Sequence, residues 1–331
     1  MKLGMSYVSE HIPEHIHEDM KAIVDMGCTQ VLAAFTDPSL YGGINGAFRR
    51  AGEIGRRNGL TVYAQIWGYA NTFGGGKVSK FMLEDTSVWR VRADGSRIAR
   101  GCLNNPGFME YFEKLARKCF ERGYQGIYID GPGRMHDDKR QGRERCFCQY
   151  CQDKFRRQYG GDLLASQSAP EFEEFAARGL VEFVAEACSR ASKIAPNFRT
   201  ICCMWPKSKQ ACWEPVSAIR DLDVFGTYPY WHLPYVGYGG SLEAAAADAT
   251  LTQQLAAKHG KESWIWLGAY EIPKGREKEI VYEGGKALAA SGCNAIYTWT
   301  YRSGLGLDEE SDDHEASWTQ VKRLYRELAS T

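Results

Sequence analysis

The feature that most constrains the fold of this chain is the alternation of short apolar segments with longer amphipathic ones. Eight short segments are nearly continuous in apolar residues, as expected of parallel strands that are covered on both faces. They are Leu3–Val8, Gln30–Thr36, Thr61–Trp67, Gly126–Asp130, Thr200–Trp205, Val224–Tyr230, Trp264–Tyr270 and Ala295–Tyr301.

Between these segments lie stretches whose apolar residues recur with the spacing of an α-helix. The clearest are Pro13–Met26, Asn45–Asn58, Gly107–Arg122, Glu171–Ile194, Leu242–His259, Glu277–Ala290 and His314–Leu328. Several are followed by a glycine, such as Gly27 or Gly123, which suits the left-handed residue at a helix end. The alternation predicts a (β/α)8 TIM barrel of the α/β class, forming a single domain over residues 1–331. A doubly wound open sheet is the alternative.

Composition restricts the class of protein. The chain carries 41 basic and 41 acidic residues, and this balance argues against a nucleic-acid partner. No apolar run is long enough to span a bilayer, and we expect no membrane association and no signal peptide at the N-terminus. Eleven cysteines, an odd number, lie mostly inside strand or helix patterns, which favours a reduced, cytoplasmic protein. No glycine pattern typical of nucleotide binding follows any strand.

Two long loops, residues 68–106 and 131–150, are expected at the C-terminal face of the barrel. The second contains Cys146, Cys148 and Cys151, three thiols within six residues, which suit a tetrahedral ion. Cys102, in the first loop, is the best candidate for a fourth ligand. The sequence therefore predicts a structural Zn2+ that clips the two loops together; the alternative is three unrelated thiols near a helix start.

The cysteine run and several other segments of the chain resemble the family 42 glycoside hydrolases, which are β-galactosidases. The similar segments are Gly95-Ser-Arg, Cys102-Leu-Asn-Asn-Pro106, the three-cysteine run with Phe155 and Tyr159-Gly160, Trp264-Ile-Trp-Leu, Glu271, Pro273 and Gly292 through Arg302. The resemblance implies a barrel domain with a four-cysteine zinc site. It also implies a glycosidase, here without the family's additional C-terminal domains.

The end of the fourth predicted strand departs from that family. Family 42 enzymes read Asp-Asn-Glu there, and the glutamate is their acid/base, whereas this chain reads Asp130-Gly131-Pro132. The acid/base is therefore not carried over, which puts β-galactosidase activity in doubt.

Asp130 and Glu271 are the carboxylate pair we predict for catalysis, because each follows a strand at the face where barrel active sites lie. The matching position makes Glu271 the nucleophile or base and Asp130 the acid, although the roles can be swapped. We expect retention, which needs carboxyl groups about 5 Å apart, whereas about 6.5–9.5 Å implies inversion. The alternatives are a turn or capping role for Asp130 and a solvated loop position for Glu271. Further carboxylates in strand-end loops are Asp37, Glu10 and Asp137.

Aromatic and polar residues gather at the predicted strand ends, where flat sugar faces and hydroxyl groups would find partners. The predicted substrate-binding residues are Tyr7, Trp67, Asn71, Trp205, Tyr228, Tyr230, His232, Trp299 and Arg302. About half of the rings are equally suited to filling the barrel interior. Arg302 is also suited to pairing with Glu271 or to binding the carboxylate of a uronic acid. His11 and His136 also follow strands, but a lone loop histidine is more often surface.

The sequence thus predicts a glycosidase that acts on an oligosaccharide or small glycoside, with a homo-oligomer allowed. A metal-dependent sugar isomerase or epimerase, using histidines and Asp130, is one alternative. A carbohydrate-binding barrel without catalysis, suggested by Pro132, is the other.

Overall fold

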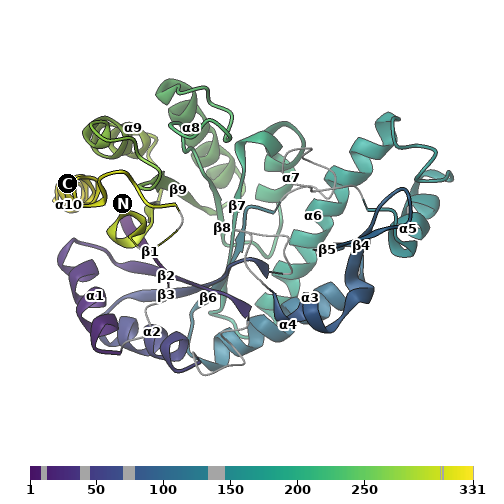
Figure 1. Ribbon diagram of the computed structural model, residues 1–331, viewed down its shortest axis with the longest axis horizontal. Helices are drawn as coiled ribbons and strands as arrows, with labels where there is room; N and C mark the ends of the chain where they lie inside the picture. Colours follow the sequence, from purple (N-terminus) through teal and green to yellow (C-terminus); the bar gives the residue numbers. More distant parts are fainter. Residues whose placement is uncertain are drawn as a thin grey trace.

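The computed structural model describes residues 1–8, 13–37, 45–69, 79–132, 146–305, 307 and 309–330. Eight parallel strands close into a barrel in the order β1-β10-β9-β8-β7-β6-β3-β2, which confirms the predicted TIM barrel and excludes the open sheet (Figure 1). The strands are β1 Lys2–Val8, β2 Gln30–Phe35, β3 Thr61–Ile66, β6 Gly126–Asp130, β7 Arg199–Met204, β8 Val224–Thr227, β9 Glu262–Gly268 and β10 Ala295–Trp299.

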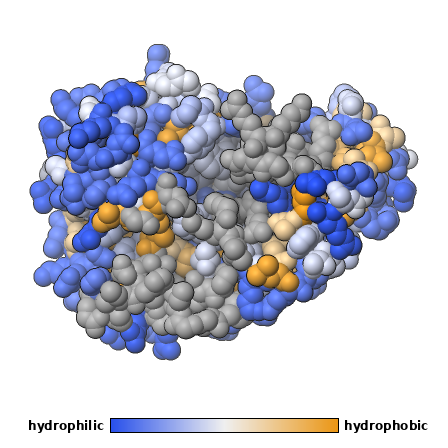
Figure 2. All heavy atoms as spheres, in the orientation of Figure 1, coloured by the Kyte–Doolittle hydropathy of each residue, from blue (hydrophilic) through white to orange (hydrophobic). Residues whose placement is uncertain are grey.

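Helices surround the barrel (Figure 1). The α-helices of the described ranges are α1 Pro13–Asp25, α2 Asn45–Arg57, α3 Lys80–Glu84, α4 Pro106–Glu121, α5 Gln149–Tyr159, α6 Pro170–Ser192, α7 Glu214–Ser217, α8 Leu242–Lys258, α9 Gly284–Ala289 and α10 His314–Ala329. The predicted helix Glu277–Ala290 is a π-helical segment, Lys278–Glu283, followed by α9. Figure 2 shows mainly hydrophilic residues over the outer helices around α8, α9 and α10, because their apolar faces pack inward.

The chain ends meet on one side of the ring. β1 pairs with β10 in register Lys2 to Ala295, and this pairing closes the barrel. The last helix, α10, packs behind the same strands, where the Tyr325 hydroxyl donates to the carbonyl of Gly4 at 2.7 Å. No helix within the described ranges has the length and apolar character needed to cross a membrane.

Large rings opposed to glycines fill the barrel interior. Tyr63, Trp264, Trp266 and Tyr297 are almost completely buried, and the Trp264 and Tyr297 rings stack with centroids 4.1 Å apart. A Cβ at Gly4 would lie 2.3 Å from the Tyr297 ring, so that strand position must lack a side chain. The barrel interior is therefore a packed core and not a ligand cavity.

A small unit lies beside the barrel, formed by the loops that follow β3 and β6 (Figure 1). It contains the antiparallel hairpin of β4, Trp89–Val91, and β5, Arg97–Gly101, together with α3 and α5. The sequence predicted long loops here but none of these elements.

Candidate functional site at the C-terminal end of the barrel

Asp130 is the last residue of β6 and only 9% of its surface is exposed. Gln65 Nε2 donates to one carboxylate oxygen at 2.6 Å, and the Tyr228 hydroxyl donates to the other. The Tyr228 oxygen in turn accepts from the Gly131 amide at 3.0 Å and contacts the Tyr128 hydroxyl at 2.6 Å. These contacts hold the carboxylate in one orientation at the top of the packed core.

The donors of this network remain protonated. Burial, followed by the negative charge of Asp130, raises the pKa of Tyr228 well above its usual value. A hydroxyl that keeps its proton donates to Asp130 at every ordinary pH. Hydrogen bonds to a carboxylate favour its ionised form and oppose the desolvation that burial brings.

The Asp-Gly-Pro sequence has a local steric reason. Gly131 adopts a left-handed φ of +46°, and a Cβ at this position would lie 2.2 Å from Trp205 Nε1. The Trp205 ring lies over Tyr228, with centroids 4.7 Å apart. Glycine therefore allows the indole to lie directly against the backbone that follows Asp130.

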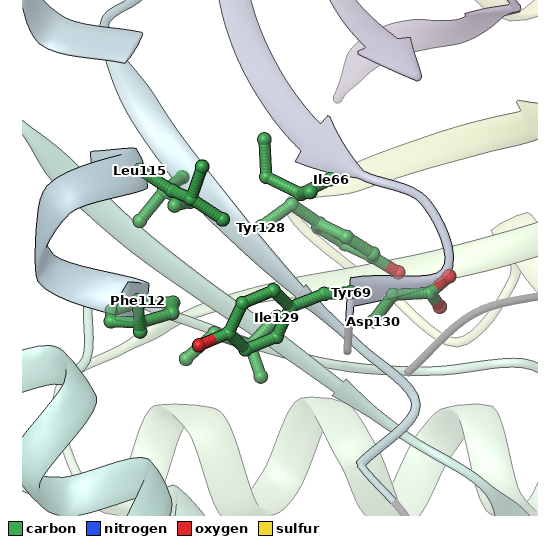
Figure 3. A pocket seen from close by; sticks show the side chains of 8 residues that line it. Ile66, Tyr69, Phe112, Leu115, Tyr128, Ile129 and Asp130 are labelled. Atoms are coloured by element: carbon green, nitrogen blue, oxygen red, sulfur yellow. The ribbon is translucent and has the colours of Figure 1, made fainter. Parts of the chain in front are cut away.

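Figure 3 shows a small cavity on the helix side of Asp130, between the strand ends and α4. Ile66, Phe112 and Leu115 are among its mostly apolar lining residues. The Asp130 carboxyl group points away from Phe112 and Leu115. This cavity is thus a packing void behind the strands, and the polar chemistry of Asp130 faces elsewhere.

Glu271 lies three residues beyond the end of β9, exposed and with a left-handed φ of +48°. Its amide donates to the Glu309 carbonyl at 3.2 Å, and its Oε2 accepts from the Tyr235 hydroxyl at 3.2 Å. The inward position at the strand end is Gly268, where a Cβ would lie 2.8 Å from His232 Cε1. The histidine ring thus fills the space beside the strand end, and the nearest following carboxylate is on the loop.

A row of tyrosines runs from the neighbourhood of Asp130 to the residue before Glu271. The Tyr228 and Tyr230 rings are 5.7 Å apart, and the Tyr230 and Tyr270 rings are 5.4 Å apart. Tyr228 contacts Asp130, and Tyr270 directly precedes Glu271. This buried row therefore connects the surroundings of Asp130 with the segment that leads to Glu271.

The other predicted binding residues have different surroundings. Trp67 and Trp299 meet edge to face, 5.5 Å apart, in the same aromatic group as Tyr228 and Tyr230. Tyr7 instead packs outside the strands and donates to Asp19 of α1 at 2.9 Å. Arg302 lies 3.9 Å from Asp19, and no contact with Glu271 is found among the described residues. Asn71, Glu10, His11, His136 and Asp137 lie outside the described residues.

Asp37 has the contacts of a structural residue. It is almost fully buried and accepts from the Ser79 and Tyr111 hydroxyls at 2.8 and 2.7 Å. It also accepts from the amide of Lys80 at 3.0 Å, which begins α3. This carboxylate joins the loop after β2 to α3 and α4.

His232 is a neutral imidazole with a defined tautomer. Its Nε2 donates to the Tyr270 carbonyl at 3.1 Å, which leaves Nδ1 as an acceptor. Burial lowers the pKa of His232 to about 4, below the value of about 6.5 expected in the unfolded chain.

This difference predicts an acid-dependent loss of stability. Between pH 6.5 and 4 the unfolded chain binds this proton and the folded chain does not. The free energy of unfolding should therefore fall as pH falls, by up to about 1.4 kcal/mol per pH unit from this residue. Urea unfolding across that window should show a shallower pH dependence for His232→Gln. An unchanged slope in His232→Gln would contradict the assignment.

The four predicted cysteine ligands come together in the small unit beside the barrel. The sulfurs of Cys102, Cys146, Cys148 and Cys151 all lie within 4.8 Å of one another. Cys102 follows β5, and Cys151 lies in the first turn of α5. The cluster could hold a metal ion, and it is the only such group of His, Cys, Asp or Glu side chains found in the described part of the chain.

Gln65 and Tyr235 were missed as site residues by the sequence analysis. Gln65 was detectable as the one amide in an otherwise apolar strand segment. Tyr235 had no such signal, because it lies in a loop and its contact with Glu271 depends on the fold.

Solved structures with the same fold include several glycosidases. The β-galactosidase of the Antarctic haloarchaeon Halorubrum lacusprofundi is 16% identical, with a TM-score of 0.74 over 100% of this chain and 58% of that protein. The β-galactosidase of Marinomonas ef1 is 13% identical, with a TM-score of 0.72 over 100% and 59%. The catalytic domain of a β-amylase from Paenibacillus polymyxa is 10% identical, with a TM-score of 0.66 over 99% and 98%.

These likenesses establish the barrel fold. The chain spans a little more than half the length of the two β-galactosidases. No protein-family model matches the sequence, and no similarity to a curated protein is significant.

Proposed function

We propose that this protein is a glycoside hydrolase acting on an oligosaccharide or small glycoside. The observation that carries the proposal is the buried Asp130 carboxylate at the end of the fourth barrel strand, held by the Gln65 and Tyr228 donors. This is the face of the barrel where active sites lie. The whole-length likeness of the fold to β-galactosidases and a β-amylase supports the same class of reaction.

The contacts of Asp130 favour the role of nucleophile, which swaps the two roles that the family resemblance implies. A carboxylate that accepts from Gln65 and Tyr228 is stabilised in the ionised form, and an ionised carboxylate attacks rather than protonates. Glu271 is then the acid, because it is the exposed carboxyl group at the other end of the tyrosine row.

Each step then follows from these positions. Asp130 attacks the anomeric carbon while Glu271 protonates the departing glycosidic oxygen, which gives a glycosyl ester and a free alcohol. The Glu271 carboxylate then takes a proton from a water molecule. The oxygen of that water attacks the anomeric carbon, which releases the sugar and restores the Asp130 carboxylate. Two displacements at the same carbon retain its configuration.

A structural zinc ion is part of the proposal. Four thiolates are a donor set typical of Zn2+, and a regular tetrahedron with bonds of about 2.3 Å separates its sulfurs by about 3.8 Å. The Cys102 sulfur lies 3.5 Å from those of Cys148 and Cys151, close to that spacing. The ion would join the β4–β5 hairpin to α5 and would leave no position open for substrate.

The remaining proposals concern the whole chain. We propose one barrel domain over residues 1–331, and a cytoplasmic location because none of the eleven cysteines is in a disulfide bond. The neutral net charge supports a carbohydrate rather than a nucleic acid as partner.

Glu271→Gln tests the acid role. With chromogenic and natural glycosides as a panel, we expect kcat/KM to fall about 10²-fold or more for disaccharides, whose leaving groups need protonation. For dinitrophenyl glycosides the loss should be below about tenfold, since that leaving group departs as an anion. Glu243→Gln, an exposed glutamate in the first turn of α8, should match the wild type. Equal losses on both substrate types would exclude Glu271 as the acid.

A carbohydrate-binding barrel without catalysis is the second candidate. Gly268 at the inward end of β9 favours it, because the strand itself offers no carboxylate there. Saccharide binding without turnover of any panel member would support this candidate. The isomerase alternative has less support, because no group of histidine and carboxylate side chains that could hold a metal ion is found in the described ranges.

A further inference from the structure

We infer that Tyr235 is the stacking platform for the leaving-group portion of the substrate, so that the protein acts on glycosides whose leaving group is itself a ring. This inference rests on the proposed function. It adds a residue and a substrate class to that function: a sugar or aryl group linked to the cleaved sugar.

The backbone around Tyr235 is a tight turn held at both ends. The Val236 amide donates to the Leu233 carbonyl at 3.2 Å. Pro234 occupies the second position of this turn, where its restricted φ is favoured. Leu233 and Val236 are each 2% exposed and pack with the aromatic core of the barrel. The turn therefore presents Tyr235 outward from a fixed base.

The ring of Tyr235 is exposed although its neighbours are not. It is 39% exposed, whereas Tyr230 and Tyr270 are each 4% exposed. An exposed aromatic ring on a rigid turn retains a flat apolar surface in contact with water. Sugar rings present C–H faces to such surfaces, and covering the ring would recover this apolar area.

The contact with Glu271 fixes which part of the substrate would cover the ring. The Tyr235 hydroxyl donates to Glu271 Oε2 at 3.2 Å. Glu271, as the proposed acid, must lie beside the glycosidic oxygen that it protonates, and the leaving group begins at that oxygen. A ring beside Glu271 and on the exposed side of the tyrosine row therefore meets the leaving group, while the cleaved sugar lies toward Asp130.

The hydroxyl and the ring of Tyr235 are separable by mutation. Tyr235→Phe keeps the ring and removes the hydrogen bond to Glu271, whereas Tyr235→Ala removes both. For a disaccharide, we expect Tyr235→Ala to lower kcat/KM about tenfold or more, and Tyr235→Phe to lower it less than about threefold. For the glycosyl fluoride of the same sugar, whose leaving group has no ring, both variants should equal the wild type.

Phe120→Ala is the matched control, because Phe120 is an exposed ring, 43% accessible, near the end of the helix that leads into the start of β6. Phe120→Ala should leave kcat/KM unchanged for both the disaccharide and the glycosyl fluoride. If Tyr235→Phe loses as much activity as Tyr235→Ala, the residue acts through Glu271 and the platform is excluded. Equal losses of Tyr235→Ala on the disaccharide and the fluoride, or no loss on either, also overturn it.

Binding distinguishes failure of the platform from failure of the hydrolase proposal. If the wild type cleaves no glycoside, the hydrolase proposal fails. Calorimetric titration with lactose, mannotetraose and maltotetraose then measures the contribution of Tyr235 to saccharide binding, independently of catalysis. At least about tenfold weaker binding to Tyr235→Ala than to Tyr235→Phe for one of these saccharides would support a stacking role. Equal affinities for all three, or no binding by the wild type, would overturn it.

Discussion

Asp130→Asn should abolish glycoside hydrolysis, with kcat reduced by about 10³-fold or more. The amide keeps the shape of the side chain and can still accept from one donor, but it cannot attack the anomeric carbon. The fall in kcat is measured with the chromogenic glycoside that the wild type cleaves best. Retained activity within about tenfold would remove Asp130 from the mechanism.

Asp37→Asn is the matched control, since Asp37 is also a buried aspartate beyond a strand end with several donors. Its amide group would face the Ser79 and Tyr111 hydroxyls, and the lost hydrogen bonds should cost about 1–3 kcal/mol of unfolding free energy. We expect a lower melting temperature with kcat near that of the wild type. The two variants therefore separate a chemical role from a structural one.

Asp130→Gly with added azide separates the nucleophile from the acid. If Asp130 is the nucleophile, azide enters the vacated space and gives a glycosyl azide of inverted anomeric configuration. If Asp130 is instead the acid, azide attacks an intermediate formed on another carboxylate, and the product has retained configuration. Nuclear magnetic resonance of the azide product distinguishes the two.

Removal of the metal ligands should have the second large effect. We expect about one zinc per chain by elemental analysis of the wild type, and none in Cys148→Ser, since three remaining thiolates bind the ion far more weakly. The cluster joins segments that are far apart in sequence, the end of the β4–β5 hairpin and the start of α5. Without the ion, these segments should exchange amide hydrogen faster than the barrel strands do.

Cys293→Ser controls for general effects of cysteine loss, because Cys293 is buried but lies outside the cluster. Its zinc content should equal that of the wild type. A wild-type protein that carries no zinc after growth in zinc-supplemented medium would refute the structural-zinc proposal while leaving the barrel and Asp130 unaffected.

The barrel was predictable because each strand is a continuous apolar run between helical repeats. The same continuity hides which strand residues point inward, since both faces of a parallel strand are buried. Tyr7 was therefore predicted at the substrate site, whereas its side chain packs against α1. Gln65 was detectable as the one amide of its segment, but its inward direction and its contact with Asp130 are known only once β3 is placed.

The ends of the strands were less predictable than their centres. The seventh predicted strand reached Tyr270, but β9 ends at Gly268. The prediction ran too far because Ala269 and Tyr270 are still buried and apolar after the strand has ended. The apolar run in the sequence thus continues beyond the last residue of the β-strand. The position of Glu271 relative to the strand depends on this difference, and so does its contact with Tyr235.

The pairing of glycines with large neighbours inside the barrel has a consequence for how the sequence can change over time. Gly4 faces Tyr297, and Gly226 faces Cys203 and Trp264, at distances that admit no added methyl group. A larger residue at Gly4 needs a smaller one at Tyr297 on the adjacent strand β10, and one at Gly226 needs a smaller residue at Cys203 together with a shift of the Trp264 backbone. Homologous chains should therefore vary at these positions in compensating sets, and such covariation would trace the interior layers without any coordinates.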